Sequence, residues 1–554
     1  WKESNVDISG ATNATYTATA AGSYTVRVTN SNGCSTTSSA FAVTENANPT
    51  TSISGNSSFC SGGNTVLNSN ATAGSGTISS YQWKESNVDI SGATNATYTA
   101  TAAGSYTVRV TNSNGCSTTS SAFAVTENAN PTTSISGNSS FCAGGNTVLS
   151  SNATAGSGTI SSYQWKESNI DISGETNATY IATTAGSYSV KVTNSNGCST
   201  TSAAFMVTES AYPTVSINGN SSFCTGTNTL LTANASAGSG TIGSYQWKES
   251  NIDISGATNS TYNATTAGSY TVRVTNSYGC STTSSAFSVS ETPNGTWIGI
   301  TSSDWNTAGN WCGGVPTSTT NVVIPNGTPY QPDVITGDKY AHNLIVASGV
   351  TLDIVSGSFR VSGSITNNGI ITQSGGIISF EGTAPQTIPP LSLRNVTINN
   401  AAGITILGDL TINGTLTFTS GTISTGSNTV IINSTGSVSH TDGWVNGNLR
   451  RYVPTGSGVI ESFDIGDDTH YLPVTITFVT VTAAGNLTGH TNTGDHPEIA
   501  SSHLNAAKSV KSYWTFGKDG TLAFTTYNAT FNWPAGYIDP DADATHFMIG
   551  KFDQ

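Results

Sequence analysis

The 554-residue chain carries a net charge of −14 and only 17 Lys and Arg, and charged residues make up 9% of it. So few basic groups cannot neutralise a stretch of phosphates, which excludes nucleic acid as a partner and argues against docking on anionic lipid. No run of about 18 apolar residues occurs, so no membrane-spanning helix is expected in this sequence. The length allows several domains, each with its own core.

The N-terminal half of the chain is built from one repeated unit. The sequence Trp-Lys-Glu-Ser-Asn begins at Trp1, Trp83, Trp165 and Trp247, at a constant interval, and residues 1–60 are identical to residues 83–142. Near-identical copies in series extend a chain or multiply a binding surface, whereas catalysis needs one particular constellation of residues. The repeats therefore predict a stalk or a multivalent binder, and they argue against an enzyme.

Within one repeat, apolar residues alternate with Ser and Thr in short runs, for example at 163–165, 188–192 and 204–207. Such period-two runs, broken by Gly and Asn, are typical of strands in an antiparallel sandwich. About seven strands in one repeat predict an immunoglobulin-like β-sandwich. The predicted boundaries are a partial repeat at 1–46 and full repeats at 47–128, 129–210 and 211–291.

Each full repeat contains two cysteines, and the spacing between them is the same in every repeat. This regularity predicts three disulfides within repeats, in an oxidising compartment: Cys60–Cys116, Cys142–Cys198 and Cys224–Cys280. The alternative is a bridge between neighbouring repeats, such as Cys34 with Cys60. The strand between those two cysteines is expected to hold their sulfurs far apart, which favours pairing within repeats. No Cys-x-x-Cys pair accompanies the cysteines, so a zinc site is not expected.

Four short motifs mark a full repeat: Phe141-Cys142-x-Gly-Gly, Tyr163-Gln-Trp165-Lys, Ala185-Gly-Ser-Tyr188 and Asn196-Gly-Cys198. They resemble the tandem immunoglobulin-like repeats of large secreted surface proteins of the Bacteroidota, and the resemblance covers residues 1–291. It implies that Trp165 packs against the core on strand C and that Tyr188 forms the corner at strand F. An antibody domain has its second cysteine two residues after that Tyr, where this repeat has Val190. The disulfide is therefore not expected to bridge the two sheets.

Residues 292–450 begin with Trp297, Trp305 and Trp311 and continue as short alternating strands with Gly or Asn at most corners. This pattern predicts a right-handed β-helix-like solenoid, with a second sandwich as the alternative. A looser similarity recurs over about fifty residues, as between Asn343 and Asn395. The three Trp are candidates for glycan contact by stacking; the alternative is core packing over the first solenoid turn. The segment also resembles regions of Bacteroidota proteins exported by the type IX system.

Residues 451–554 have longer strands and predict a terminal β-sandwich, which we expect to be cut short within a longer protein. Its candidates for a hydrolytic or metal role are Asp464, Asp467, Asp468, His470 and His496. A second set, Asp539, Asp541 and Asp543, alternates as in Ca²⁺-binding loops but lacks the Gly and the bidentate Glu of an EF-hand. It predicts either a structural Ca²⁺ site or an acidic turn, and no other cofactor is expected.

The sequence as a whole therefore predicts an all-β, extracellular or cell-surface protein without catalytic activity. Its expected role is that of an adhesin or a stalk that projects a binding region towards an unknown extracellular glycan or protein. The alternative is a carbohydrate-binding or carbohydrate-active protein with its site in 292–554 and the repeats as spacer. Glycan cleavage needs paired carboxylates, yet the acids of the solenoid region are far apart in the sequence: Asp353, Glu381, Asp409 and Asp442.

Overall fold

The computed structural model describes residues 1–502, 504–543, 545 and 549–551, and the regular secondary structure of these residues is almost entirely β-strand. They form two compact units. The first holds residues 1–215, 235–244 and 273–283; the second holds residues 216–234, 245–272 and 284–554. The helical segments of the described residues are single 3₁₀ turns, and none of them is long and apolar enough to cross a membrane.

Each full repeat is a sandwich of two sheets, as predicted. In the repeat 47–128 the small sheet has the order β12-β9-β7, and the large sheet has the order β11-β10-β13-β15-β8 with β14 beside β13. Only β8 runs parallel to its neighbour β15. The strand bounds are β7 (Thr50–Gly55), β8 (Ser58–Cys60), β9 (Thr65–Thr72), β10 (Ile78–Glu85), β11 (Val88–Asp89), β12 (Thr97–Ala100), β13 (Gly104–Asn112), β14 (Ser117–Thr119) and β15 (Phe123–Asn128).

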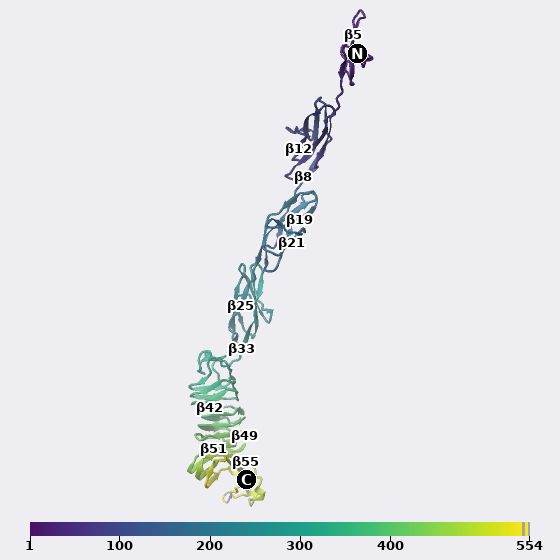
Figure 1. Ribbon diagram of the computed structural model, residues 1–554. Coiled ribbons are helices and arrows are strands. Elements are labelled where there is room, and N and C mark those ends of the chain that lie inside the picture. The colour runs from purple at the N-terminus through teal and green to yellow at the C-terminus, as the bar shows by residue number, and fades with distance from the viewer. Residues whose placement is uncertain (503, 544, 546–548, 552–554) are drawn as a thin grey trace. The chain divides into compact units, whose positions relative to one another are not determined.

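The next two repeats have the same strand order. Figure 1 labels one strand or more in each, among them β19 (Ile160–Glu167) and β25 (Thr214–Asn218). The strands that end at the first cysteine of these repeats again pair parallel with the last strand of the repeat: β17 (Ser140–Cys142) with β24 (Phe205–Ser210), and β26 (Ser222–Cys224) with β33 (Phe287–Thr292).

One Trp and one Tyr organise the core of each repeat. Trp165 is fully buried, and its Nε1 donates a hydrogen bond to the Asn177 carbonyl at 2.9 Å. Tyr188 is fully buried as well, and its hydroxyl donates to the Thr184 carbonyl at 2.9 Å, which is the geometry of a tyrosine corner. The roles predicted for Trp165 and Tyr188 are therefore confirmed.

Residues 322–466 form a parallel β-solenoid of about seven turns, coloured teal to green in Figure 1. The predicted solenoid is thus confirmed, and it extends beyond the predicted boundary at 450. Stacked neighbours such as Phe359 and Ile378, or Leu416 and Val438, mark the start and end of one turn. One turn is therefore much shorter than the repeat seen in the sequence between Asn343 and Asn395, which does not correspond to the coil.

Three columns of strands make up the solenoid. One column contains β36 (Asp338–Ala341), β39 (Ser358–Val361), β42 (Ile377–Phe380), β45 (Val396–Asn399), β48 (Thr415–Ser420) and β50 (Ser437–His440). The second begins with β34 (Val322–Ile324), β37 (Leu344–Val346) and β40 (Ile365–Asn367) and resumes with β43 (Gln386–Ile388) and β46 (Ile404–Ile406). The third begins with β35 (Asp333–Val334), β38 (Thr351–Ile354) and β41 (Ile370–Thr372) and resumes with β44 (Leu391–Leu393) and β47 (Leu410–Ile412).

The terminal sandwich is built directly onto the last turns of the solenoid. Strand β49 (Ile423–Ile432) pairs parallel with β51 (Val445–Val453), and β51 then pairs antiparallel with β55 (Gly485–Thr493). One continuous apolar core runs from Trp297 to Leu522. The remaining strands are β52 (Gly456–Phe463), β53 (Ile465–Gly466), β54 (Val474–Ala483), β56 (Ser512–Lys518), β57 (Ala523–Phe524) and β58 (Tyr527–Phe531).

The stacked core makes a specific stability prediction. Leu410 is fully buried between Leu391 and Val430 of the neighbouring turns. We expect Leu410→Ala to lower the free energy of unfolding by about 2–5 kcal/mol, because the cavity would be only partly filled. Leu407→Ala is the matched control, since Leu407 is 63% exposed, and should change it by less than about 0.5 kcal/mol. Urea unfolding followed by tryptophan fluorescence measures both; equal losses would contradict the assigned core.

Candidate functional site

Each of the three disulfides joins one folded unit of the chain to the next. Cys60 bonds to Cys198 and Cys142 to Cys280, each over 138 residues, and Cys224 bonds to Cys312 over 88 residues. The predicted pairs Cys60–Cys116, Cys142–Cys198 and Cys224–Cys280 are therefore wrong. Two of the disulfides join neighbouring repeats instead, and the third joins the repeat 211–291 to the Trp-rich segment that follows it. They are not the Cys34–Cys60 type either, because Cys34 and Cys116 are the free cysteines of the described residues.

The two cysteines of one repeat lie at its opposite ends, which explains the error. Cys142 pairs in register with Ser210, where the chain leaves the repeat. Cys198 lies in a turn at the other end, and its Sγ is 3.9 Å from the carbonyl oxygen of Asn128, where the chain enters the repeat. Since a disulfide needs Cα atoms within about 7 Å, the two cysteines of one repeat cannot bond to each other, and each bonds to a cysteine of an adjacent unit.

A buried asparagine holds the linker at the same junction. Asn194 is 1% exposed, and its Nδ2 donates to the carbonyls of Ala129 and Ala155 at 3.1 and 2.9 Å. Its Oδ1 accepts from the backbone N–H groups of Asn196 and Cys198 at 3.1 and 3.0 Å. One side chain therefore shapes the cysteine turn and fixes the linker. Asn112 and Asn276 do the same in the neighbouring repeats.

The linker also lies directly on the repeat that follows it. The backbone N–H of Ala129 donates to Ser157 Oγ at 2.9 Å. A Cβ added to Gly156, which has φ +67°, would come within 2.3 Å of the Asn130 carbonyl oxygen. Only glycine therefore permits this close approach. The short linkers are parts of the folded junction and not free tethers.

We predict that the junction opens locally when its disulfide is removed. Ser210 lies at the junction between the repeats 129–210 and 211–291. It is 2% exposed, and Cys280 Sγ contacts its carbonyl oxygen. In the double variant Cys142→Ser/Cys280→Ser, glutamyl endopeptidase should cut the Glu209–Ser210 bond faster than in the unaltered protein, because the segment opens more often. The equivalent Glu127–Asn128 bond keeps the Cys60–Cys198 disulfide and serves as internal control. Unchanged cleavage after Glu209 would contradict the role of the disulfide.

The three Trp of the cap are buried and cannot stack on a glycan. Trp297 and Trp305 are fully buried and Trp311 is 3% exposed. Trp311 packs edge-on against the other two, with ring centroids 4.9 and 4.6 Å away, and Trp305 packs on Phe359 of the solenoid. The predicted glycan contact of these rings is therefore wrong, and the alternative of core packing over the first turn is confirmed.

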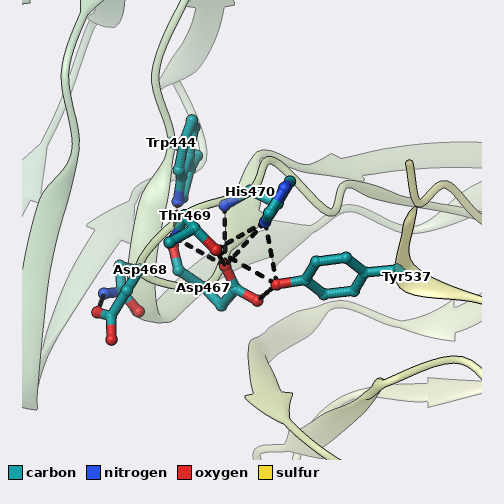
Figure 2. Close-up of polar contacts among 7 residues, drawn as sticks. Trp444, Asp467, Asp468, Thr469, His470 and Tyr537 are labelled. Atoms are coloured by element: carbon teal, nitrogen blue, oxygen red, sulfur yellow. Dashed lines mark hydrogen bonds and ion pairs between the residues drawn. The ribbon is translucent and has the colours of Figure 1, made fainter. Parts of the chain in front are cut away.

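A polar cluster in the terminal sandwich gathers several of the predicted candidates (Figure 2). Asp467 is 4% exposed; its Oδ1 accepts from the backbone N–H groups of Thr469 and His470 at 2.8 Å, and its Oδ2 accepts from the Tyr537 hydroxyl. The Nδ1 of His470 lies 3.1 Å from the same hydroxyl. Trp444 Nε1 donates to the Asp467 carbonyl at 2.7 Å. The contacts tie the loop 467–470 to the segment around Tyr537.

The other candidates of this set face different groups. Asp468 Oδ1 accepts from Asn446 Nδ2 at 2.7 Å, and Asp464 accepts from the Tyr471 hydroxyl at 2.7 Å. The His496 ring packs edge-on against Tyr513. The described residues contain no group of three or more His, Cys, Asp or Glu arranged to hold a metal ion. The carboxylates of Asp464, Asp467 and Asp468 thus accept hydrogen bonds from neighbouring protein groups.

Electrostatics agree with a structural role for Asp467. Burial raises the pKa of its carboxyl group, but the hydrogen bonds from Tyr537, Thr469 and His470 outweigh burial and lower the pKa below its ordinary value. Burial and the hydrogen bond to Asp467 raise the pKa of Tyr537. The carboxylate therefore stays ionised, and its donors occupy the positions that a metal ion or a substrate proton would need.

The predicted Ca²⁺ ligands are not gathered into one site. Asp539 Oδ2 accepts from the backbone N–H of Ser509 at 2.9 Å. Asp543 Oδ1 accepts from the backbone N–H of Thr545 at 2.9 Å. Asp541 is exposed. Within the described ranges, Asp539 thus contacts a segment distant in the sequence, and Asp543 caps a local turn, as the acidic-turn alternative expects.

The solenoid contains an ion ladder that the sequence interpretation missed. Arg360 lies between Asp338 of the preceding turn and Glu381 of the following one, with N–O distances of 3.0 and 2.5 Å. The spacing of these three residues in the sequence matches the length of one solenoid turn, and it is the signal from which the ladder could be predicted. All three side chains are partly exposed. Asp338 and Glu381 are each paired with Arg360, whereas a catalytic pair of carboxylates would face a substrate.

Comparison with known proteins gives partial matches. Residues 296–388 match the family model "Domain of unknown function (DUF8693)". No curated protein matches the chain. Among solved structures, three N-terminal domains of the bacteriophage RB49 Highly Immunogenic Outer Capsid protein (Hoc) are similar at 18% identity and a TM-score of 0.29, covering 44% of this chain and 99% of theirs. Fibronectin(III)-like modules of Clostridium thermocellum CbhA are similar at 16% identity and a TM-score of 0.22, covering 28% and 94%.

Asp467 makes a pH-dependent prediction. Because its pKa is lowered by folding, its carboxylate stabilises the fold above the unfolded value of about 3.9, and the contribution is lost as the pH falls through the folded-state pKa. Asp467→Asn should therefore lower the free energy of unfolding by about 1.5–3 kcal/mol at pH 7 and by less at pH 3. Asp468→Asn is the exposed control and should have little effect. Urea unfolding at both pH values measures this, and a loss independent of pH would contradict the assignment.

Proposed function

We propose that this chain is an extracellular, non-catalytic repeat protein that acts as a load-bearing stalk or adhesin and projects its solenoid and terminal sandwich from a cell surface. The supporting observation is one disulfide at each of three successive junctions, including the junction between the fourth repeat and the Trp-rich cap of the solenoid. Such bonds persist in oxidising compartments, which supports an extracellular location.

The arrangement of these bonds favours a mechanical role. Between Cys60 and Cys312, a covalent path much shorter than the chain itself passes through the Cys60–Cys198 bond, the segment from Cys198 to Cys224, and the Cys224–Cys312 bond. At about 3.6 Å per extended residue, the fully extended path is roughly 90 Å long, whereas the fully extended chain from Cys60 to Cys312 would be roughly 900 Å long without the disulfides. A pulling force would therefore be carried largely by covalent bonds.

The absence of catalysis is part of the proposal. It is supported by the saturated carboxylate of Asp467 and by the Arg360 ladder. The carbohydrate-related alternative is less well supported, because its candidate stacking rings, Trp297, Trp305 and Trp311, are buried. The ligand of the projected region is an extracellular protein or glycan.

Single-molecule stretching of the oxidised chain between its two ends tests the proposal. We expect a total unfolding extension shorter by roughly 800 Å than that of the same chain in dithiothreitol, because reduction frees the residues between Cys60 and Cys312. The variant Cys224→Ser/Cys312→Ser is the matched control and should show an intermediate extension. Equal extensions with and without reductant would refute a stalk whose load is carried by disulfides.

A further inference from the structure

Three aromatic rings meet on the surface where the solenoid passes into the terminal sandwich. His440 ends β50, the last strand of its column, and its ring stacks on that of Tyr471, with ring centroids 4.2 Å apart and 12° between the planes. Trp444 lies beside the same Tyr471, with ring centroids 6.3 Å apart. His440 is exposed, and the other two residues are partly exposed. We call these three rings the aromatic platform.

Hydrogen bonds hold the two inner rings of the platform in place. The Tyr471 hydroxyl donates to Asp464 Oδ1 at 2.7 Å, and Asp464 is 9% exposed. Trp444 Nε1 donates to the Asp467 carbonyl at 2.7 Å (Figure 2). A Cβ added to Gly466 would come within 2.7 Å of the Trp444 ring, so the indole lies directly on the glycine backbone. The polar groups of both rings are thus occupied by protein partners, and the platform offers its aromatic faces to a ligand.

A polar pair lies on the same side of the sheet as the platform. Trp444 and Asn446 are two residues apart where β51 begins, so their side chains point to the same side, about 7 Å apart. Asn446 pairs in register with Gly466, which in turn pairs with Tyr471. Asn446 Nδ2 donates to Asp468 Oδ1 at 2.7 Å. Within the described part of the chain, this bond leaves the second amide N–H, Asn446 Oδ1 and Asp468 Oδ2 for a ligand.

Aromatic faces beside such a polar pair match the chemistry of a sugar ring. The C–H groups on one face of a pyranose carry partial positive charge and stack on the negative face of an aromatic ring. Its hydroxyls lie at the rim, where they can donate to a carboxylate and accept from an amide. The surface next to His440 is rich in hydroxyls as well: Ser437 and Ser439 of β50 are exposed and lie in register with Thr415 and Thr417.

The charges around the platform favour a neutral sugar. Asp442, between two of the rings in the sequence, and Asp468 are both exposed. The two basic residues of β51, Arg450 and Arg451, lie further along the strand, and Arg451 pairs with Glu461. Exposed carboxylates repel the carboxylate or sulfate of an acidic sugar, whereas they accept hydrogen bonds from neutral hydroxyls.

We propose that His440, Trp444, Tyr471, Asn446 and Asp468 form a binding site for a neutral hexopyranose unit of an extracellular glycan. One sugar unit stacks on the aromatic platform, and hydroxyls of the same unit or the next one bond to the polar pair. This inference rests on the proposed function, in which the solenoid and the terminal sandwich are the projected region. It deepens that function, because it names a glycan as the ligand and gives the site that binds it.

Isothermal titration calorimetry of the oxidised 554-residue chain tests the ligand class. The probes are hexasaccharides of β-linked glucose, mannose, galactose and N-acetylglucosamine. Hexagalacturonic acid is the acidic comparison, and choline is a cation that aromatic faces also bind. We expect at least one neutral hexasaccharide to bind more tightly than either comparison. Absence of binding by all four neutral probes would overturn the proposal, as would tighter binding of hexagalacturonic acid or choline.

Two variants test the site itself. His440→Ala and Asp468→Ala should each weaken binding of the neutral hexasaccharide about fivefold to tenfold, because a stacking face or a hydroxyl acceptor is lost. Both residues are exposed, so the midpoint of urea unfolding should stay unchanged. His342→Ala is the matched control: His342 follows the first strand of the same column and contacts Ser362. Equal affinities in all three variants would overturn the assigned site.

A chemical readout locates the ligand without a mutation. Diethyl pyrocarbonate modifies accessible histidine rings, and the bound hexasaccharide should slow its reaction at His440 severalfold while His342 reacts at an unchanged rate. Mass spectrometry of the digested chain measures both rates. Binding that leaves the rate at His440 unchanged would place the sugar elsewhere and overturn the proposal.

These readouts do not involve the disulfides, so they are independent of the stretching experiment. An oxidised chain that shows the shorter extension but binds no neutral hexasaccharide would overturn this site alone. A chain that binds the sugar at His440 but extends equally with and without reductant would overturn the disulfide-borne stalk and leave the glycan site in place.

Discussion

The junction between repeats is the constraint on which the repeat region depends. Its linker carbonyls accept from a buried Asn of the following repeat, its cysteine turn is shaped by that same side chain, and a disulfide joins the two repeats across it. A sandwich of this size has its own Trp and Tyr core, so the disulfide is not required to complete that core. It acts where a tandem protein is weakest, at the connection between folded units.

The architecture within a repeat could be predicted from local patterns. Alternation located the strands, and the motifs around Trp165 and Tyr188 located the core, because both signals report which side of a sheet a residue faces. The disulfide pairing could not be predicted in this way. The constant spacing between Cys142 and Cys198 and their counterparts is a property of the repeat unit, and it contains no information about which ends of successive units meet.

The solenoid shows a similar limit. Short strands and glycine corners predicted its class, yet the length of a turn was not recognised, and the ladder of Asp338, Arg360 and Glu381 was therefore missed. In the terminal sandwich, acidic and His residues suggested chemistry, but the environment decides their role. Asp467 is surrounded by donors from its own loop and from Tyr537, far away in the sequence, so its candidate site is a structural clip.

The disulfide map of the oxidised protein tests the central claim most directly. Proteolysis between the cysteines and mass spectrometry without reduction can assign each pair, because the residues after Cys60, Cys142 and Cys224 are Ser, Ala and Thr and identify their peptides. Bridges that join each repeat to the next unit along the chain predict linked peptides for Cys60 with Cys198, Cys142 with Cys280, and Cys224 with Cys312. Linked peptides for Cys142 with Cys198 would contradict the covalent junctions and the load path built on them.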